Sequence, residues 1–169
     1  MMGNKDNKNH SVYRKKAKNL GLGGNIMKLD TILVPVDGTE VSDLALDTAK
    51  KMAAKFNSKI VVLNAVDFVN RGSIHESSDY DPVVQETLQK RGNRILEDTN
   101  AKLQGFNFET IPALGHAGDA IITYCENNEV DLIIMATRSA TKIRRFVIGS
   151  VTNYVIHHTK VPVLAIPVE

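Results

Sequence analysis

The stretch DLIIMATRSATKIRRFVIGSVT, residues 131–152, determines how the chain is organised. It opens with the apolar run of residues 132–135, which is typical of a strand buried on both faces. A polar and strongly basic loop follows. The stretch closes on Gly149 and Ser150, a glycine followed by a residue that favours helix N-caps, and apolar residues then recur at helical spacing. The sequence therefore predicts a strand, a loop and a helix, in that order.

This order favours an anion site at the start of the helix. The first turn of a helix presents unpaired N–H groups and the positive end of its dipole, which together hold a phosphate. Gly149 would let the backbone approach a ligand closely, and Ser150 adds a hydroxyl donor. The loop adds positive charge through Arg138, Lys142, Arg144 and Arg145. The alternative is a solvated surface loop followed by an ordinary helix cap.

Composition and charge limit the possible classes of protein. The chain has 169 residues, enough for one domain with a proper core. With 21 basic and 19 acidic residues the net charge is only +2, which does not indicate a nucleic-acid binder. The basic residues gather in the first 28 residues and in the loop at 138–145, and neither cluster has the interleaved aromatic residues of a single-strand binder. We expect no nucleic-acid partner.

Cysteine content and hydropathy bear on the compartment. Cys125 is the single cysteine, so the chain forms no intramolecular disulfide, and we expect a small core thiol in a reducing environment. No apolar run approaches the roughly 18 residues of a membrane span, and the N-terminus lacks the apolar core of a signal peptide. We therefore expect a cytoplasmic protein without a membrane partner.

Residues 1–26 differ from everything after them. They are polar, rich in Asn, Lys and Gly, and show no sustained period, which predicts a flexible basic extension or leader. A basic arm that touches nucleic acid or membrane is the alternative. We expect the folded domain to occupy residues 27–169.

From residue 30 the pattern alternates between strands and helices. Strands are expected at residues 31–36, 59–66, 108–114, 132–135 and 161–168, and helices at 42–56, 83–103, 119–127 and 150–158. Residues 67–82 read as a long loop. On the first helix we expect one apolar face formed by Leu44, Ala45, Ala49, Met52 and Ala53, and we expect Gly92 to weaken the middle of the second helix. Five strands that alternate with four helices predict an α/β fold, an open doubly wound parallel sheet with helices on both faces. The pattern alone does not fix the order of the strands.

Two further groups of polar residues have local explanations. Asp37 follows the first strand, where open α/β sheets build their ligand crevices, but an aspartate there can also cap its own turn. His157 and His158 end the last helix, where a cation interacts favourably with the dipole. His75 and His116 have no cysteines or paired carboxylates at ligand spacing, so we predict no metal site.

Five segments of the chain resemble the universal stress protein family. They are ILVPVDGTEVS at residues 32–42, LNAVD at 63–67, DLIIMATRS at 131–139, GSVTNYV at 149–155 and VPVLAIP at 161–167. The resemblance covers residues 28–169. It implies a five-stranded parallel sheet of order 3-2-1-4-5. It also implies a homodimer through the last strand, to which Val163, Leu164 and Ile166 would contribute.

One branch of that family binds ATP through a motif of Gly, two residues, Gly, nine residues, and then Gly-Ser or Gly-Thr. In this chain the first two glycines are replaced by Ala136 and Ser139, whereas Gly149 and Ser150 match. A non-glycine residue costs about 1 kcal/mol or more if the second position needs a positive φ. The spacing of the motif is kept, but the two lost glycines argue against a tight triphosphate cradle.

The resemblance implies a set of residues that bind the nucleotide. The adenosine end would meet the first strand and the backbone near Ala65, and the phosphates would meet the stretch from the fourth strand to the last helix. The predicted residues are Pro35, Val36, Asp37, Ala65, Met135, Ala136, Arg138, Ser139, Gly149, Ser150, Val151 and Thr152. No catalytic residue is predicted.

Three functions remain open from the sequence. The first is a stress-response regulator that binds ATP, ADP or AMP, with Mg²⁺ accompanying the nucleotide, and acts on an unknown protein partner. The second is a dimeric interaction module without a nucleotide. The third is a slow adenine-nucleotide hydrolase. It has the least support, because the chain lacks the phosphate-binding loop GxxxxGK[ST] and the nucleophile turn GxSxG.

Overall fold

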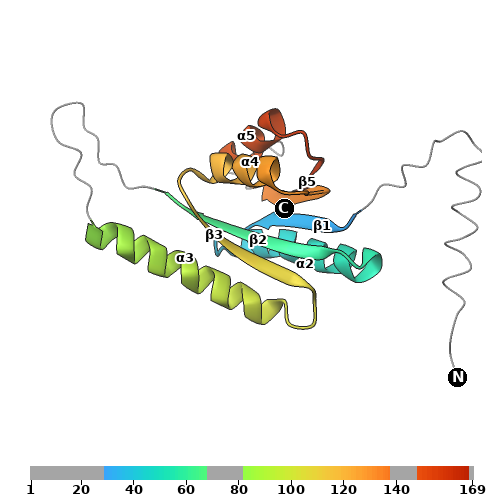
Figure 1. Ribbon diagram of the computed structural model, residues 1–169, viewed down its shortest axis with the longest axis horizontal. Coiled ribbons are helices and arrows are strands. Elements are labelled where there is room, and N and C mark those ends of the chain that lie inside the picture. Colours follow the sequence, from blue (N-terminus) through green and yellow to red (C-terminus); the bar gives the residue numbers. More distant parts are fainter. Residues whose placement is uncertain (1–28, 68–81, 138–147, 168–169) are drawn as a thin grey trace, which may run out of the picture.

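The computed structural model describes residues 29–67, 82–137 and 148–167. In this part of the chain strands and helices alternate, as the sequence pattern predicts (Figure 1). The strands are β1 (Thr31–Pro35), β2 (Lys59–Val66), β3 (Phe108–Leu114), β4 (Leu132–Thr137) and β5 (Val163–Pro167). The helices are α2 (Glu40–Phe56), α3 (Pro82–Lys102), α4 (Ala117–Asn127) and α5 (Ser150–His158).

The strands form one parallel sheet in the order β3-β2-β1-β4-β5. The chain builds outward from β1 through β2 to β3, and then returns to place β4 on the other side of β1. The direction of winding therefore reverses between β1 and β4. The predicted fold class and the strand order implied by the family resemblance are both confirmed.

Helices cover both faces of the sheet. Figure 1 shows α2 and α3 on one face and α4 and α5 on the other. Alternate side chains of β1 point to opposite faces of the sheet. Ile32 and Val34 pack with α2 and α3, and Leu33 packs with α4 and α5. All three side chains are fully buried. Burial of each such side chain stabilises the fold by about 1.5–3 kcal/mol, so the two cores hold the sheet between them.

Asp131 joins the starts of the two central strands. Its Oδ2 atom accepts hydrogen bonds from the backbone N–H of Asp30 at 2.7 Å and of Thr31 at 2.9 Å. Its own N–H donates to the Thr31 carbonyl at 3.0 Å. This clamp lies next to the first paired residues, Ile32 and Leu132, and so holds β1 and β4 in register at their amino ends.

Two details of how the helices pack on the sheet differ from the sequence expectation. Leu44 was expected on the inner face of α2 but is 43% exposed, whereas Leu46 is buried. The buried stripe runs through Ala45, Leu46, Ala49 and Ala53. Gly92 was expected to weaken the middle of α3, yet the helix passes through it, because Gly92 is the place where α3 lies against β2.

Candidate functional site

A cavity of about 310 Å³ lies at the carboxyl edge of the sheet. It opens where β1 and β4 end, at the reversal of winding, which is where open α/β sheets bind their ligands. Its walls come from the segment that leaves β1, the starts of α2, α4 and α5, and the ends of β2 and β4. The volume is in the range of small-molecule sites, roughly 300–1,000 Å³.

Most of the residues predicted from sequence line this one cavity. They are Pro35, Val36, Asp37, Ala65, Met135, Ala136, Gly149, Ser150, Val151 and Thr152. The other two predicted residues, Arg138 and Ser139, lie outside the described residues, as do the remaining basic residues of the loop. The sequence thus identified segments that the fold brings together from β1, β2, β4 and α5.

The wall after β1 is fixed by hydrogen bonds. The Val36 N–H donates to the Leu63 carbonyl at 2.9 Å, and the Asn64 side-chain Nδ2 donates to the Val36 carbonyl at 2.8 Å. Asp37 Oδ1 accepts from the backbone N–H of Thr39 at 3.1 Å and from the Thr39 hydroxyl at 2.6 Å. Asp37 therefore stabilises its own turn, as one of the two interpretations of the sequence predicted. Asp37 also lines the cavity.

Sequence reasoning missed the contribution of α2. Thr39, Val41 and Ser42 also line the cavity. Thr39 is the N-cap of α2 and its Oγ1 accepts from the Ser42 N–H at 3.4 Å, while the Ser42 hydroxyl donates to the Thr39 carbonyl at 2.8 Å. The helix therefore begins at Glu40, two residues earlier than the start at residue 42 that we expected. A threonine followed by acidic residues in the first turn, Glu40 and Asp43, was the available signal.

At the end of β4, the two lining residues belong to different layers. Met135 packs with the core on the α4 and α5 side. Ala136 packs against the core on the α2 side, together with Ile166 of β5. Successive side chains of a strand point to opposite faces, so the methyl group of Ala136 is used in this packing. Alanine in place of glycine at this position therefore takes little space from the cavity.

The start of α5 differs in one respect from the sequence interpretation. Gly149, and not Ser150, is the N-cap, and Ser150 is the first helical residue. Gly149 has φ −58° and ψ 152°, an ordinary extended conformation, and no side chain caps the helix. The first turn of α5 contains no acidic residue. The positive end of this helix dipole therefore faces the cavity. No side chain caps it, and no carboxylate in the first turn of the helix neutralises it.

Helix α4 adds a second N-terminus, which sequence reasoning also missed. Its first residue, Ala117, and Ile121 one turn later line the same cavity, together with Leu63 from β2. The N-cap, His116, makes no side-chain cap hydrogen bond. Its ring Nδ1 lies 2.9 Å from Asp67 Oδ1 instead. No local sequence signal places α4 at this edge, because its position follows from the crossover after β3.

The two histidines at the end of α5 bond backbone carbonyls of their own helix. The Nδ1 atom of His157 lies 2.7 Å from the Asn153 carbonyl, and that of His158 lies 2.7 Å from the Tyr154 carbonyl. Each ring therefore donates to a carbonyl of the last turns. Among the residues that the structure describes, no group of three or more His, Cys, Asp or Glu side chains could hold a metal ion.

Cys125 lies in α4 and packs at the edge of the core on the α4 and α5 side, as expected for a core thiol. Burial raises the pKa of this thiol to about 11. The thiolate is the reactive form of cysteine, so this side chain is unreactive near neutral pH. None of the described helices combines the length and apolar character needed to cross a membrane.

Comparison with known proteins identifies relatives of the chain. Residues 28–167 match the model of the universal stress protein family. A relative with this family name, MJ0531 of Methanocaldococcus jannaschii, is 27% identical over 146 residues, which cover 85% of this chain and 84% of the relative.

Solved structures show the same fold. Universal stress protein UspA from Lactobacillus plantarum superposes with a TM-score of 0.69 at 25% identity, over 82% of this chain and 98% of that one. A family protein from Arabidopsis thaliana, solved with AMP bound, superposes with a TM-score of 0.60 at 18% identity, over 81% of this chain and 90% of that one. With the family model matching most of its length, this chain belongs to the universal stress protein family.

Proposed function

We propose that this chain binds an adenine nucleotide in the cavity at the carboxyl edge of the sheet and acts as a stress-response regulator. The observation that carries the proposal is the convergence of two helix N-termini, those of α4 and α5, on one cavity without side-chain caps. Such N-termini attract phosphate through N–H groups and the helix dipole. The first turn of α5 has no acidic residue, whereas that of α4 contains Asp119, so α5 is the stronger phosphate site. The AMP bound to the Arabidopsis relative supports the same class of ligand.

The rest of the cavity suits a nucleoside. Apolar side chains such as Val36, Val41 and Met135 offer surfaces for a base, and the Asp37 carboxylate is a suitable acceptor for a ribose hydroxyl. The phosphates would lie at Gly149, Ser150 and the first turn of α5. Mg²⁺ would accompany a di- or triphosphate as its counter-ion. The reduced Cys125 fits a cytoplasmic location.

We infer a homodimer as the working assembly. β5 is the last strand in the sheet order, and Leu164 on it is 36% exposed, with Ile148 near the start of α5 at 45%. An exposed strand edge with apolar side chains favours pairing with a second strand. A Leu164→Lys variant should run as a monomer in light scattering, and a dimer of unchanged stability would contradict this interface.

A dimeric interaction module without a nucleotide is the second candidate. The replacement of two motif glycines by Ala136 and Ser139 favours it. In that case the protein would act only through a protein partner. Calorimetric titration of the nucleotide-stripped protein with AMP and ATP, with and without Mg²⁺, separates the two candidates. We expect micromolar binding, and no heat at millimolar nucleotide would favour the interaction module.

The Gly149→Glu variant tests where the nucleotide binds. The φ and ψ of Gly149 are open to any L-residue, so the fold should persist, while the new carboxylate would occupy and repel the phosphate position. We expect binding to be abolished. Thr123→Glu places the same charge on the exposed face of α4 away from this cavity and should bind normally. Equal affinity of the Gly149→Glu variant and the native protein would remove this site assignment.

A further inference from the structure

The contact between α4 and α5 is centred on one tyrosine. Gly118 of α4 is buried, and a Cβ added to it would lie 2.5 Å from the Cδ1 atom of Tyr154 on α5. The ring of Tyr154 therefore rests directly on the backbone of α4. No other residue fits at position 118 without moving the ring, so the pair Gly118 and Tyr154 sets how closely the two helices approach.

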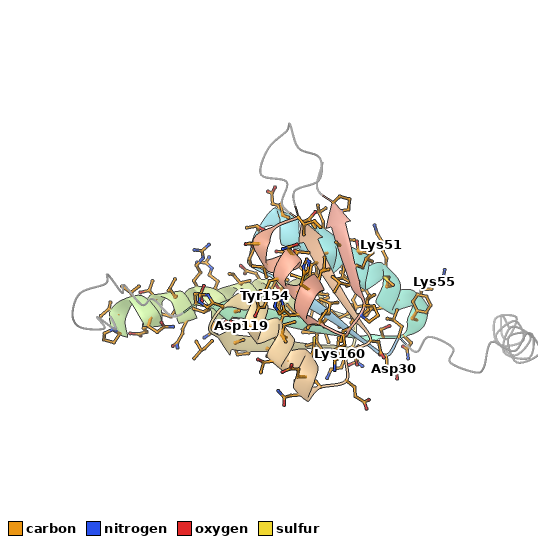
Figure 2. The ribbon with its side chains drawn as sticks, turned by 90° about the horizontal axis from the view of Figure 1, so that it is seen from above. Asp30, Lys51, Lys55, Asp119, Tyr154 and Lys160 are labelled. Atoms are coloured by element: carbon orange, nitrogen blue, oxygen red, sulfur yellow. The ribbon has the colours of Figure 1, made fainter. Side chains whose placement is uncertain are left out.

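The orientation of the Tyr154 ring is held by polar contacts. Its hydroxyl donates to Asp119 Oδ1 at 2.5 Å, and Figure 2 shows these two labelled side chains together. Its ring stacks on His158 with centroids 4.1 Å apart and planes 21° apart. The His158 ring in turn bonds the Tyr154 carbonyl. Tyr154 is 38% exposed, so burial alone does not explain this set of contacts.

This contact lies within the first two turns of the two helices whose N-termini line the cavity. Asp119 is two residues after Ala117, which begins α4 at the cavity, and Tyr154 is five residues after the N-cap Gly149. The donors of both helix N-termini are useful to a bound anion only within hydrogen-bond range, and the dipole effect fades beyond the first turn. A change in the separation of the helices therefore alters the anion end of the cavity.

We propose that Tyr154 is a positioning residue for the ligand, because its hydroxyl bond to Asp119 and its packing on Gly118 fix the spacing of the two N-termini. This inference rests on the proposed nucleotide function of the same cavity. Tyr154 itself is not expected to touch the ligand. The Tyr154 hydroxyl is a donor at neutral pH, and its hydrogen bond to Asp119 raises its pKa further.

The test is the affinity of the full chain for AMP in a set of variants. Tyr154→Phe removes only the hydroxyl, and we expect AMP to bind about three- to tenfold more weakly. This size of effect is typical of residues that influence a site without touching the ligand. Asp119→Asn keeps an acceptor oxygen and should bind at least as tightly as the native protein. Tyr124→Phe, which removes a hydroxyl from the other side of α4, should leave the affinity unchanged.

A double-mutant cycle separates positioning from stability. Asp119→Ala and Tyr154→Phe should not add when combined, because both break the same bond. The inference is overturned if Tyr154→Phe binds AMP like the native protein, or if Asp119→Asn loses as much affinity as Tyr154→Phe. Failure of the native protein to bind AMP or ATP would instead overturn the proposed function, and this inference with it. Unfolding curves of each variant verify that the folded protein is titrated.

Discussion

The side-chain amide of Asn64 on β2 donates to the carbonyl of Val36, 2.8 Å away, at the point where β1 has ended and the cavity begins. Asn64 is only 4% exposed and Val36 only 7%. Just beyond the end of β1, this buried side-chain hydrogen bond therefore takes the place of a backbone hydrogen bond between strands. It holds in place the segment that leads to Asp37.

Replacing Asn64 with leucine should destabilise the protein and weaken ligand binding. The buried Val36 carbonyl would lose its side-chain donor, which costs about 1–3 kcal/mol of unfolding free energy. Chemical denaturation measures this loss. The matched control is Asn127→Leu, which removes an amide bond to the Thr123 carbonyl at an exposed site and should cost less than about 0.5 kcal/mol. Equal effects of the two variants would show that the Asn64 bond has no special role.

Gly92→Ala should also destabilise the protein, although alanine favours helices. The added methyl would lie 2.6 Å from Val66 Cγ2 and 2.8 Å from Asn64 Oδ1. Overpacking of this kind costs about 1–3 kcal/mol, which exceeds the gain of about 1 kcal/mol from helix propensity. Thermal unfolding measures the net effect, with Lys90→Ala on the exposed side of α3 as the control. A more stable Gly92→Ala variant would contradict the close packing of α3 on β2.

Ala136→Gly restores the first glycine of the nucleotide motif, yet it should not improve binding. The methyl of Ala136 packs against the core on the α2 side. Its removal should lower the unfolding free energy by about 0.5–1 kcal/mol through the greater backbone freedom of glycine. Affinity for AMP by calorimetry should stay within about twofold. A large gain in affinity would mean that this methyl obstructs the ligand.

The reactivity of Cys125 should depend strongly on pH. Burial raises its pKa to about 11, so at pH 8 only about one thiol in a thousand is ionised. A thiol reagent should therefore react slowly with the folded protein at pH 8, faster as the pH rises toward 11, and fast at pH 8 in denaturant. Rapid modification of the folded protein at pH 8 would contradict the raised pKa of this partly buried side chain.

The fold was readable from sequence because its signals are local. Runs such as residues 59–66 mark strands buried on both faces, and α5 has the bounds that its apolar spacing and His157 and His158 predict. The strand order came from the family resemblance, since no local pattern encodes which strands are neighbours. Leu44 was assigned to the wrong face because apolar character alone does not locate the centre of a buried stripe.

The sequence predicts residues of the candidate site only where a single segment contains a recognisable local pattern. Gly149 and Ser150 follow a strand and a basic loop, and Asp37 follows a strand, so their place at the carboxyl edge could be predicted. Ala117 and Ile121 line the cavity only because α4 crosses back over the sheet after β3. The contact of Tyr154 with Gly118 and Asp119 depends on the packing of two helices, which no sequence period reveals.

The measurement that tests the central claim most directly is a methyl NMR titration of the native protein with AMP. Met135 and Ile121 line the cavity, whereas Ile111 lines a separate groove between α4 and β3. We predict that the methyl signals of Met135 and Ile121 shift with a saturating dependence on AMP, while that of Ile111 stays in place. Saturating shifts at Ile111 alone, or no shifts at millimolar AMP, would contradict nucleotide binding at this cavity.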